Sequence, residues 1–158
     1  MRISVVTVFI TLLVFFSLHT PMVQARDTAH LFSAQQAVEM GKAKGLLGND
    51  IEFYFSGQAH PPVAATLSKG ITTNKKTNRV NKSNEEACHW VMLSALIQLQ
   101  ESARESGGNA VINIESYYKK KSFKSSTQFE CYIGKIMAGV ALKGDVVKLE
   151  APTPKKKK

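Results

Sequence analysis

Cysteine and acidic residues are scarce in this chain of 158 residues, and each scarcity excludes a class of protein. The only cysteines are Cys88 and Cys131, which form no Cys-x-x-Cys motif, so a thioredoxin-like redox site is not expected. No tight pair of ligands with zinc spacing occurs either. The 12 acidic residues face 21 basic ones and form no convincing general acid–base pair. No catalytic residue, metal or cofactor is therefore expected.

Motifs of nucleotide and hydrolase chemistry are also absent. The two Gly-Lys pairs are followed by Ala43 and Ile136, whereas a phosphate-binding loop needs Ser or Thr there. No G-x-S-x-G elbow occurs. Spatial clusters remain open, because residues far apart in sequence can meet in the fold. The sequence thus favours a non-enzymatic protein, and the alternative is a small enzyme or metal-binding protein with a site around His60 and His89.

One long apolar run is present, at the N-terminus. Arg2 precedes the apolar segment 5–18, and Ala25 supplies a small residue at the expected cleavage position. This pattern is typical of a secretory signal peptide, which predicts a periplasmic or secreted protein. An uncleaved membrane anchor is the alternative, although the run is short for a full span. We therefore interpret residues 1–25 as a signal peptide, 26–149 as a single domain and 150–158 as a disordered basic tail.

The longest helical pattern begins at Ser83, an N-cap that forms a capping box with Glu86, and ends at the glycines 107–108. Its apolar stripe predicts a face packed on a sheet; the stripe comprises Cys88, Met92, Ala95, Leu96, Leu99 and Ala103. A buried strand is expected to follow at 110–114. These features predict an α+β fold, a two-layer sandwich in which one long helix packs on a small antiparallel-rich sheet.

Other elements are expected before and after this unit. Ser33 caps a short helix, residues 51–55 alternate as a strand, and 63–73 look extended, whereas the polar, basic segment 74–82 is expected to be a loop. Residues 129–142 are expected to form one strand with a bulge at 134–135. A turn at 144–145 then leads to a short edge strand.

The two cysteines both fall on predicted core faces. Cys88 lies on the apolar stripe of the helix, and Cys131 alternates in phase with Phe129 and Ile133. In an exported chain, this placement favours a disulfide between them. Two separately buried thiols are the alternative.

Basic residues gather in two clusters that contain no acidic residue: Lys75, Lys76, Arg79 and Lys82, and Lys119, Lys120, Lys121 and Lys124. Such clusters are either solvated surface or sites that attract polyanions. Tyr117 and Tyr118 adjoin the second cluster, where they can cover the sheet or stack on sugars or bases. No specific nucleic acid is expected as a partner.

A second face of the long helix carries Trp90, Leu93 and Ile97. These side chains either pack under another segment of the same chain or form a docking surface, which includes the interface of a homo-oligomer.

Several stretches resemble a known family. Residues 53–61, FYFSGQAHP, together with 73–90, 95–120 and 130–149, resemble small exported bacterial proteins of unknown function that often carry the name "excinuclease ATPase subunit". Such an ATPase needs Walker motifs and zinc cysteines, which are absent here, so the chain is not expected to be a genuine one. More distantly, the Ala- and Leu-rich helix, the Gly-Gly-Asn turn and the Cys-bearing strand are similar to the YbjQ-like domain and to the disulfide-stapled sensor lipoprotein of the Rcs phosphorelay. The resemblance implies a fold and an envelope location, with no catalytic residue.

These observations predict an exported, non-enzymatic binding or envelope-associated module. Its partner is expected among anionic envelope components or envelope proteins, and its working surface is expected to be basic.

Overall fold

The computed structural model describes residues 28–150, which form two α-helices, one 3₁₀ turn and six strands in the order β1, α2, β2, β3, α3, β4, η1, β5, β6. Their bounds are β1 Thr28–Ser33, α2 Ala34–Ala43, β2 Glu52–Phe55, β3 Val63–Asn78, α3 Asn84–Glu105, β4 Ala110–Ser116, η1 Tyr118–Lys120, β5 Gln128–Ile133 and β6 Met137–Leu149. The predicted signal peptide lies outside the described residues, and so does the predicted basic tail apart from Glu150. The mixed composition of elements confirms the α+β class.

All six strands belong to one sheet that is built around β6. β3 pairs antiparallel with β6 along nearly its whole length, from Val63 opposite Leu149 to Asn78 opposite Met137. On its other side, β6 pairs with β5 near its start and with β4 towards its end. β1 extends the sheet from β5, and β2 pairs parallel with β4. β6 is therefore the central strand, which explains why most of its residues are buried.

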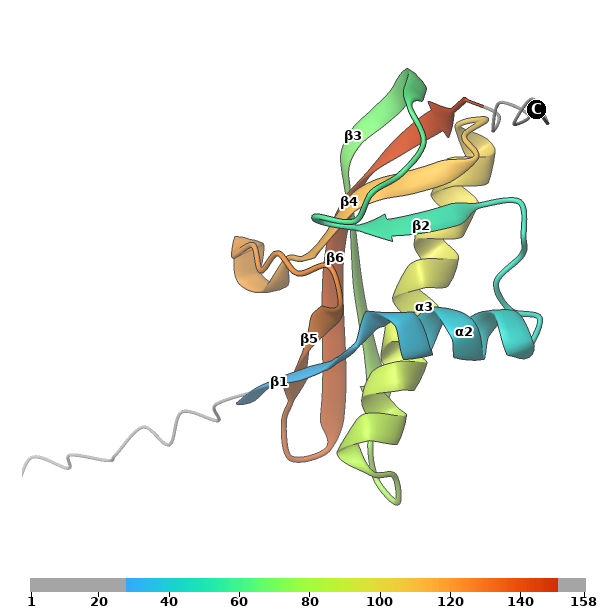
Figure 1. The fold of residues 1–158 in the computed structure, drawn as a ribbon. Coiled ribbons are helices and arrows are strands. Elements are labelled where there is room, and N and C mark those ends of the chain that lie inside the picture. The colour runs from blue at the N-terminus through green and yellow to red at the C-terminus, as the bar shows by residue number, and fades with distance from the viewer. Residues whose placement is uncertain (1–27, 151–158) are drawn as a thin grey trace, which may run out of the picture.

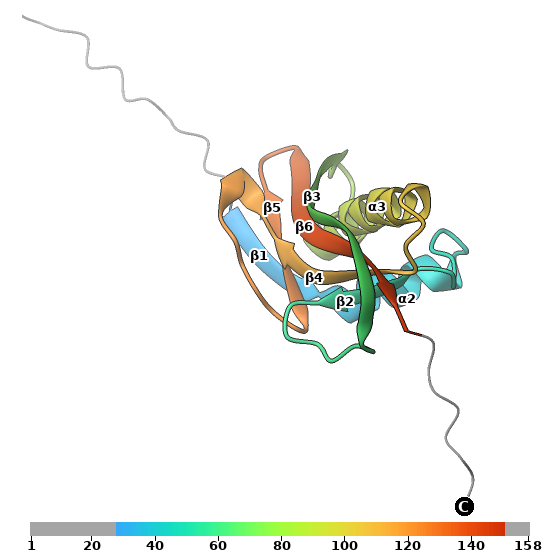
Figure 2. The ribbon, with the colours of Figure 1, turned by 90° about the horizontal axis from the view of Figure 1, so that it is seen from above.

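Both helices lie on the same side of β6 (Figures 1 and 2). Ser33 and Ser83 cap the two helices as expected, because each hydroxyl accepts a hydrogen bond from the backbone N–H three residues later. The entire predicted stripe of α3 is buried in the main core, together with Val91 and Leu93. Among residues 28–150, no helix combines the length and the apolar character needed to cross a membrane.

The link from α3 to β4 depends on two glycines for different reasons. Gly107 takes a left-handed backbone (φ 73°), as the C-cap prediction requires. Gly108 lies where a Cβ atom would approach a Val146 methyl to 2.6 Å and the Val147 carbonyl oxygen to 2.9 Å. The chain can turn back along the helix so tightly because position 108 has no side chain.

The predicted disulfide is present. Cys88 of α3 is bonded to Cys131 of β5, with their Cα atoms 5.8 Å apart, and both residues are fully buried. The bond ties the long helix to the sheet across a sequence separation of 43 residues.

Three expectations about the sheet are wrong. The small sheet that was expected beneath one long helix is a sheet of six strands within residues 28–150, and both α2 and α3 lie on one side of its central strand (Figure 1). The segment 74–78 continues β3, because backbone pairing with β6 overrides its polar composition. β1 was not expected at all.

The C-terminal half also differs from expectation. Residues 134–136 reverse the chain between β5 and β6, where a bulge within one strand was expected. The expected turn at 144–145 lies inside β6, which continues to Leu149 as the central strand and not as an edge. Near residues 144–145 the pairings of β6 with β3 and with β4 both shift register, so the strand is irregular where the turn was expected.

Candidate functional site

The most distinctive surface of the described chain is a groove along β6, on the face of the sheet opposite to the main core. Gly139 alternates with Ala138 and Val140, which belong to the main core, so position 139 faces the opposite side. By the same alternation Tyr132 of β5 lies opposite to Cys131, and Lys76 of β3 shares its face with Gly139.

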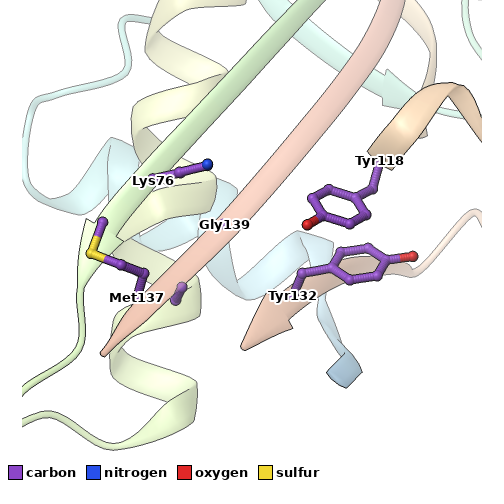
Figure 3. A pocket seen from close by; sticks show the side chains of 6 residues that line it. Lys76, Tyr118, Tyr132, Met137 and Gly139 are labelled. Carbon is purple, nitrogen blue, oxygen red and sulfur yellow. The ribbon is translucent and has the colours of Figure 1, made fainter. Parts of the chain in front are cut away.

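An aromatic pair forms one wall of this groove. The rings of Tyr118 and Tyr132 lie 3.6 Å apart between centroids with an interplanar angle of 18°, so they are stacked. Figure 3 shows this pair on one side of β6 and Lys76 on the other, with Gly139 between them. Together with Met137 and Ala138 they line a hollow of about 240 Å³.

The floor of the groove is low because position 139 is glycine. A Cβ atom there would meet the Lys75 carbonyl oxygen and the Lys76 Cγ at 3.6 Å, which is ordinary contact, and the backbone φ is not in the left-handed region. The site can therefore accept a larger residue without backbone strain, and such a residue would fill the hollow.

The phenol of Tyr132, which borders the groove, stays protonated. Burial raises the pKa of Tyr132 above its ordinary value, with a further contribution from the nearby Glu130 carboxylate, to which the Tyr132 hydroxyl donates a hydrogen bond of 3.3 Å. Tyr132 is thus a neutral aromatic surface at physiological pH.

Two more hollows continue the groove along β6. The next, of about 230 Å³, is bordered by Thr72, Thr73, Asn74, Tyr117, Lys119, Lys120 and Ala141. The last, of about 350 Å³, is polar and is bordered by Ser56, Asn113, Glu115, Lys124, Lys143, Gly144 and Asp145. The three hollows follow positions 137–139, 141 and 143–145 of one strand, so we call them together the β6 groove.

The polar end of the β6 groove is held by internal bonds. The Glu115 carboxylate, 6% exposed, accepts a hydrogen bond of 2.8 Å from Ser122 and lies 3.5 Å from the Lys143 amine and 4.0 Å from the Lys124 amine. Asp145 accepts hydrogen bonds from the Gly70 N–H and the Asn113 amide. The carboxylates of Glu115 and Asp145 are therefore occupied by bonds within the fold. They do not form a free pair that could act as general acid and general base at this end of the groove.

The predicted basic residues have different positions in the fold. Lys76, Lys119 and Lys120 border the β6 groove, and the Lys119 amine lies 5.2 Å from the centre of the Tyr118 ring. Lys75 pairs with Val140, a main-core position of β6, so it lies on the helix side of the sheet and not on the groove side. Lys121 is exposed on the loop. Lys124 belongs to the polar end.

The side chains of Arg79 and Lys82 donate hydrogen bonds within the fold. The Arg79 guanidinium donates to the Gly134 and Lys135 carbonyl oxygens and to the Asn84 side chain, and the Lys82 amine donates to the Asn78 carbonyl oxygen. Arg79 thus links two turns, Lys82 bonds within its own turn, and neither residue borders a hollow of the β6 groove.

The two histidines of the alternative site lie in different surroundings. His60 is in the exposed loop after β2, where its Nδ1 lies 2.8 Å from the Pro61 carbonyl oxygen and its ring contacts Tyr54. His89 is on α3, and its ring packs against Phe32 and Phe129. The two rings share no neighbour in these contacts. Within residues 28–150, no group of three or more His, Cys, Asp or Glu residues is placed to hold a metal ion.

The three residues considered for a docking surface differ in their exposure to solvent. Leu93 is 1% exposed and lies against Gly41 and Leu47, so it is a core residue and not a surface residue. Ile97 is half-buried against the main core. Only Trp90, 37% exposed, is open to solvent, and the Lys44 amine lies 5.2 Å from the centre of its ring.

Sequence reasoning missed Tyr132 and Gly139, the two residues that shape the aromatic hollow. The alternation in 129–133 places Tyr132 opposite the core face, but nothing in the sequence indicates that Tyr118 folds onto it. Comparison of the chain with protein-family models, with curated proteins and with solved structures finds no match in any of the three. The function is therefore argued from the residues themselves.

Proposed function

We propose that the protein is an exported, non-enzymatic binding module of the bacterial envelope, and that it binds an anionic polymer in the β6 groove. The observation that carries this proposal is the combination of Lys76, Lys119 and Lys120 with the stacked pair of Tyr118 and Tyr132 over the low floor at Gly139. Lysines attract the anionic groups of a polymer, and an exposed aromatic face packs against its rings.

The length of the β6 groove supports a polymer more than a small molecule. Three shallow hollows in succession along one strand offer repeated contacts and no single enclosed cavity. In this proposal the fold has two layers, one of helices and one of strands. The β6 groove then lies on the face of the sheet that points away from α3.

Export is supported by the N-terminal pattern of the sequence and by the Cys88–Cys131 disulfide, because disulfides persist in oxidising compartments. The net charge of +9 favours association with polyanions over association with basic partners.

The experiment that tests the proposal measures binding of fluorescently labelled polygalacturonate and heparin, with neutral dextran as the comparison. We expect binding of the two polyanions, weakened at least about tenfold when the salt concentration rises from about 20 mM to about 200 mM, because added ions screen the charges and shorten the range of their attraction. No binding of either polyanion at low salt would contradict the proposal.

A matched pair of variants then locates the site. The triple change Lys76→Gln, Lys119→Gln and Lys120→Gln is expected to weaken binding at least about fivefold. The control is Lys44→Gln with Lys69→Gln and Lys148→Gln, three exposed lysines that border none of the three hollows. Equal loss in both variants would show that only net charge matters and would remove the β6 groove as the site.

A further inference from the structure

Two turns at one end of the molecule expose apolar side chains at their outermost positions. Ile136, in the turn between β5 and β6, is 58% exposed, and Val80, in the turn between β3 and α3, is 53% exposed. They are the two most exposed large apolar residues of the described chain. Figure 1 shows both turns at the end of the molecule opposite to the β4 start and the β6 finish. Turns normally carry Gly, Asn, Asp, Ser or Pro, so two aliphatic side chains at such positions call for a reason.

The two turns are joined into one unit by Arg79. Its backbone N–H donates to the Ile136 carbonyl oxygen at 3.0 Å, and its guanidinium donates to the carbonyl oxygens of Gly134 (3.3 Å) and Lys135 (3.1 Å). A third bond, 2.7 Å long, connects the guanidinium to the Asn84 side chain at the start of α3. Val80 and Ile136 are therefore presented from adjoining, mutually bonded backbone segments. We call this unit, residues 79–82 with 134–137, the apolar tip.

Basic side chains surround the apolar tip. Lys135 directly precedes Ile136 and is exposed, Lys82 follows Val80 by two positions, and Lys76 lies on β3 next to Met137, which is 38% exposed. The acidic residues nearest in sequence are Glu85 and Glu86 in the first turn of α3 and Glu130 on β5. Within four positions of residues 79–82 and 134–137, five basic residues outnumber these three acidic ones, so this end carries a positive balance next to exposed aliphatic groups.

We propose that the apolar tip is a membrane-contact site, at which Val80 and Ile136 enter the interfacial region of an anionic lipid bilayer. The protruding aliphatic side chains can contact the acyl chains of the bilayer, and the neighbouring lysines can contact its anionic headgroups. A protein partner is a poorer fit, because two separate protruding side chains offer far less than the roughly 1,000 Å² that a stable protein interface buries. This site adjoins the β6 groove at Lys76 and Met137, but Val80 and Ile136 border none of its hollows, so the membrane contact does not depend on binding in the groove.

The test is co-sedimentation of the exported form, residues 26–158, with vesicles of phosphatidylcholine containing about 30% phosphatidylglycerol, compared with vesicles of phosphatidylcholine alone. We expect partitioning into the anionic vesicles. The double change Val80→Ser and Ile136→Ser is expected to lower the partition coefficient about tenfold or more, since each aliphatic chain loses its transfer into the interface. The matched control is Leu31→Ser with Leu67→Ser, two exposed leucines on β1 and β3 away from the apolar tip, which are expected to leave partitioning unchanged.

Each result has a defined meaning. Absence of binding to anionic vesicles at low salt overturns the proposal, and so does equal binding by wild type and the Val80/Ile136 variant, because the contact then lies elsewhere on the chain. A loss with Lys82→Gln and Lys135→Gln, without a loss with the serine variant, also overturns it, since attraction alone then accounts for binding. Every variant retains the lysines at 155–158, so a contribution from these residues is equal in all samples.

A spectroscopic readout tests insertion directly. In a Trp90→Phe background, which removes the single tryptophan of the chain, Ile136→Trp is expected to be quenched by brominated lipid, and Leu67→Trp is not. Quenching of neither, or of both equally, contradicts contact through the apolar tip. Gly139→Val, which fills the β6 groove, is expected to leave vesicle binding intact, so the two proposals can fail independently.

Discussion

At position 139 the absence of a side chain creates the aromatic hollow, and this can be tested with a single substitution. Gly139→Val places two methyl groups between Lys76 and the Tyr118–Tyr132 pair, where a Cβ meets its neighbours only at 3.6 Å. Because β-branched residues suit strands, we expect the melting temperature to stay within about 2 °C of wild type. Polygalacturonate binding is expected to fall at least about tenfold, measured by fluorescence polarisation.

A second glycine of β6 supplies the contrast. At Gly144 a Cβ atom would lie 2.8 Å from a Val111 methyl and 3.3 Å from the Ile112 carbonyl oxygen, so Gly144→Ala overpacks the core side of the strand. We expect this variant to lose about 1–3 kcal/mol of unfolding free energy in urea. Loss of binding by Gly139→Val together with a similar loss of stability would mean that filling the hollow merely damages the fold.

Asp50 and Arg104 make the one two-pronged ion pair found among the described residues, with both oxygen–nitrogen distances at 2.7 Å. The hydrogen bonds from Arg104 lower the pKa of Asp50 from 3.8 to about 2. A folded-state pKa below the unfolded value means that this pair stabilises the fold above about pH 4, and that the contribution is lost as the pH falls through about 2. The pair is exposed, so the effect is small.

The predicted result is therefore a difference in acid sensitivity between two proteins. The melting temperature of the Asp50→Asn variant is expected to fall less steeply than that of wild type between about pH 4 and pH 2, because one carboxylate no longer has to be protonated on unfolding. Parallel curves for the two proteins would show that the ion pair does not form in solution.

Some residue roles could be predicted from sequence and others could not. The cap residues Ser33 and Ser83 and the buried stripe of α3 depend on local spacing, which sequence displays directly. Arg79 and Leu93 depend on segments 40 or more positions away: Arg79 finds its acceptors at Gly134 and Lys135, and Leu93 is covered by α2. The sequence around Arg79 and Leu93 does not indicate these partners, because they come from distant segments of the chain.

At the scale of elements, the polar end of β3 shows why the sheet was underestimated. Residues 74–78 lack the apolar alternation that marks a strand, yet each pairs with β6 between Met137 and Ala141. The backbone supplies these hydrogen bonds whatever the side chains are, and one face of this segment is solvated. The same absence of signal explains why β1, which pairs with β5, was not expected.

The disulfide is the covalent link between elements that the sequence predicted correctly, and its contribution can be measured. Changing Cys88 and Cys131 together to Ala is expected to lower the unfolding free energy by about 4 kcal/mol, since the bond restricts the unfolded chain over a long loop. Equilibrium unfolding in urea gives the value, and wild type with added reductant serves as the comparison. A loss below about 1 kcal/mol would show that packing of α3 on the sheet, and not the bond, holds these two elements together.

At the scale of the whole molecule, the two proposed contacts occupy different parts of one sheet. The β6 groove runs along its central strand, and the apolar tip is formed by the turns that precede and follow the paired ends of β3 and β6. Lys76 and Met137 border the groove close to the tip. A polymer in the groove would therefore lie near a membrane contacted by the tip, which is an arrangement suited to an envelope protein.

That arrangement requires export, and export makes a prediction about the whole chain. We expect the full-length protein, produced in a bacterial host, to appear in the periplasmic fraction with a mass that corresponds to cleavage after Ala25. A chain that begins at Met followed by Arg26 is expected to stay in the cytosol with Cys88 and Cys131 reduced, whereas the exported form has no thiol that iodoacetamide can label after denaturation. Mass spectrometry of both forms measures cleavage and labelling together. An uncleaved precursor in the membrane fraction would show that residues 1–25 act as an anchor, and free thiols in the exported form would remove the oxidised compartment from the proposal.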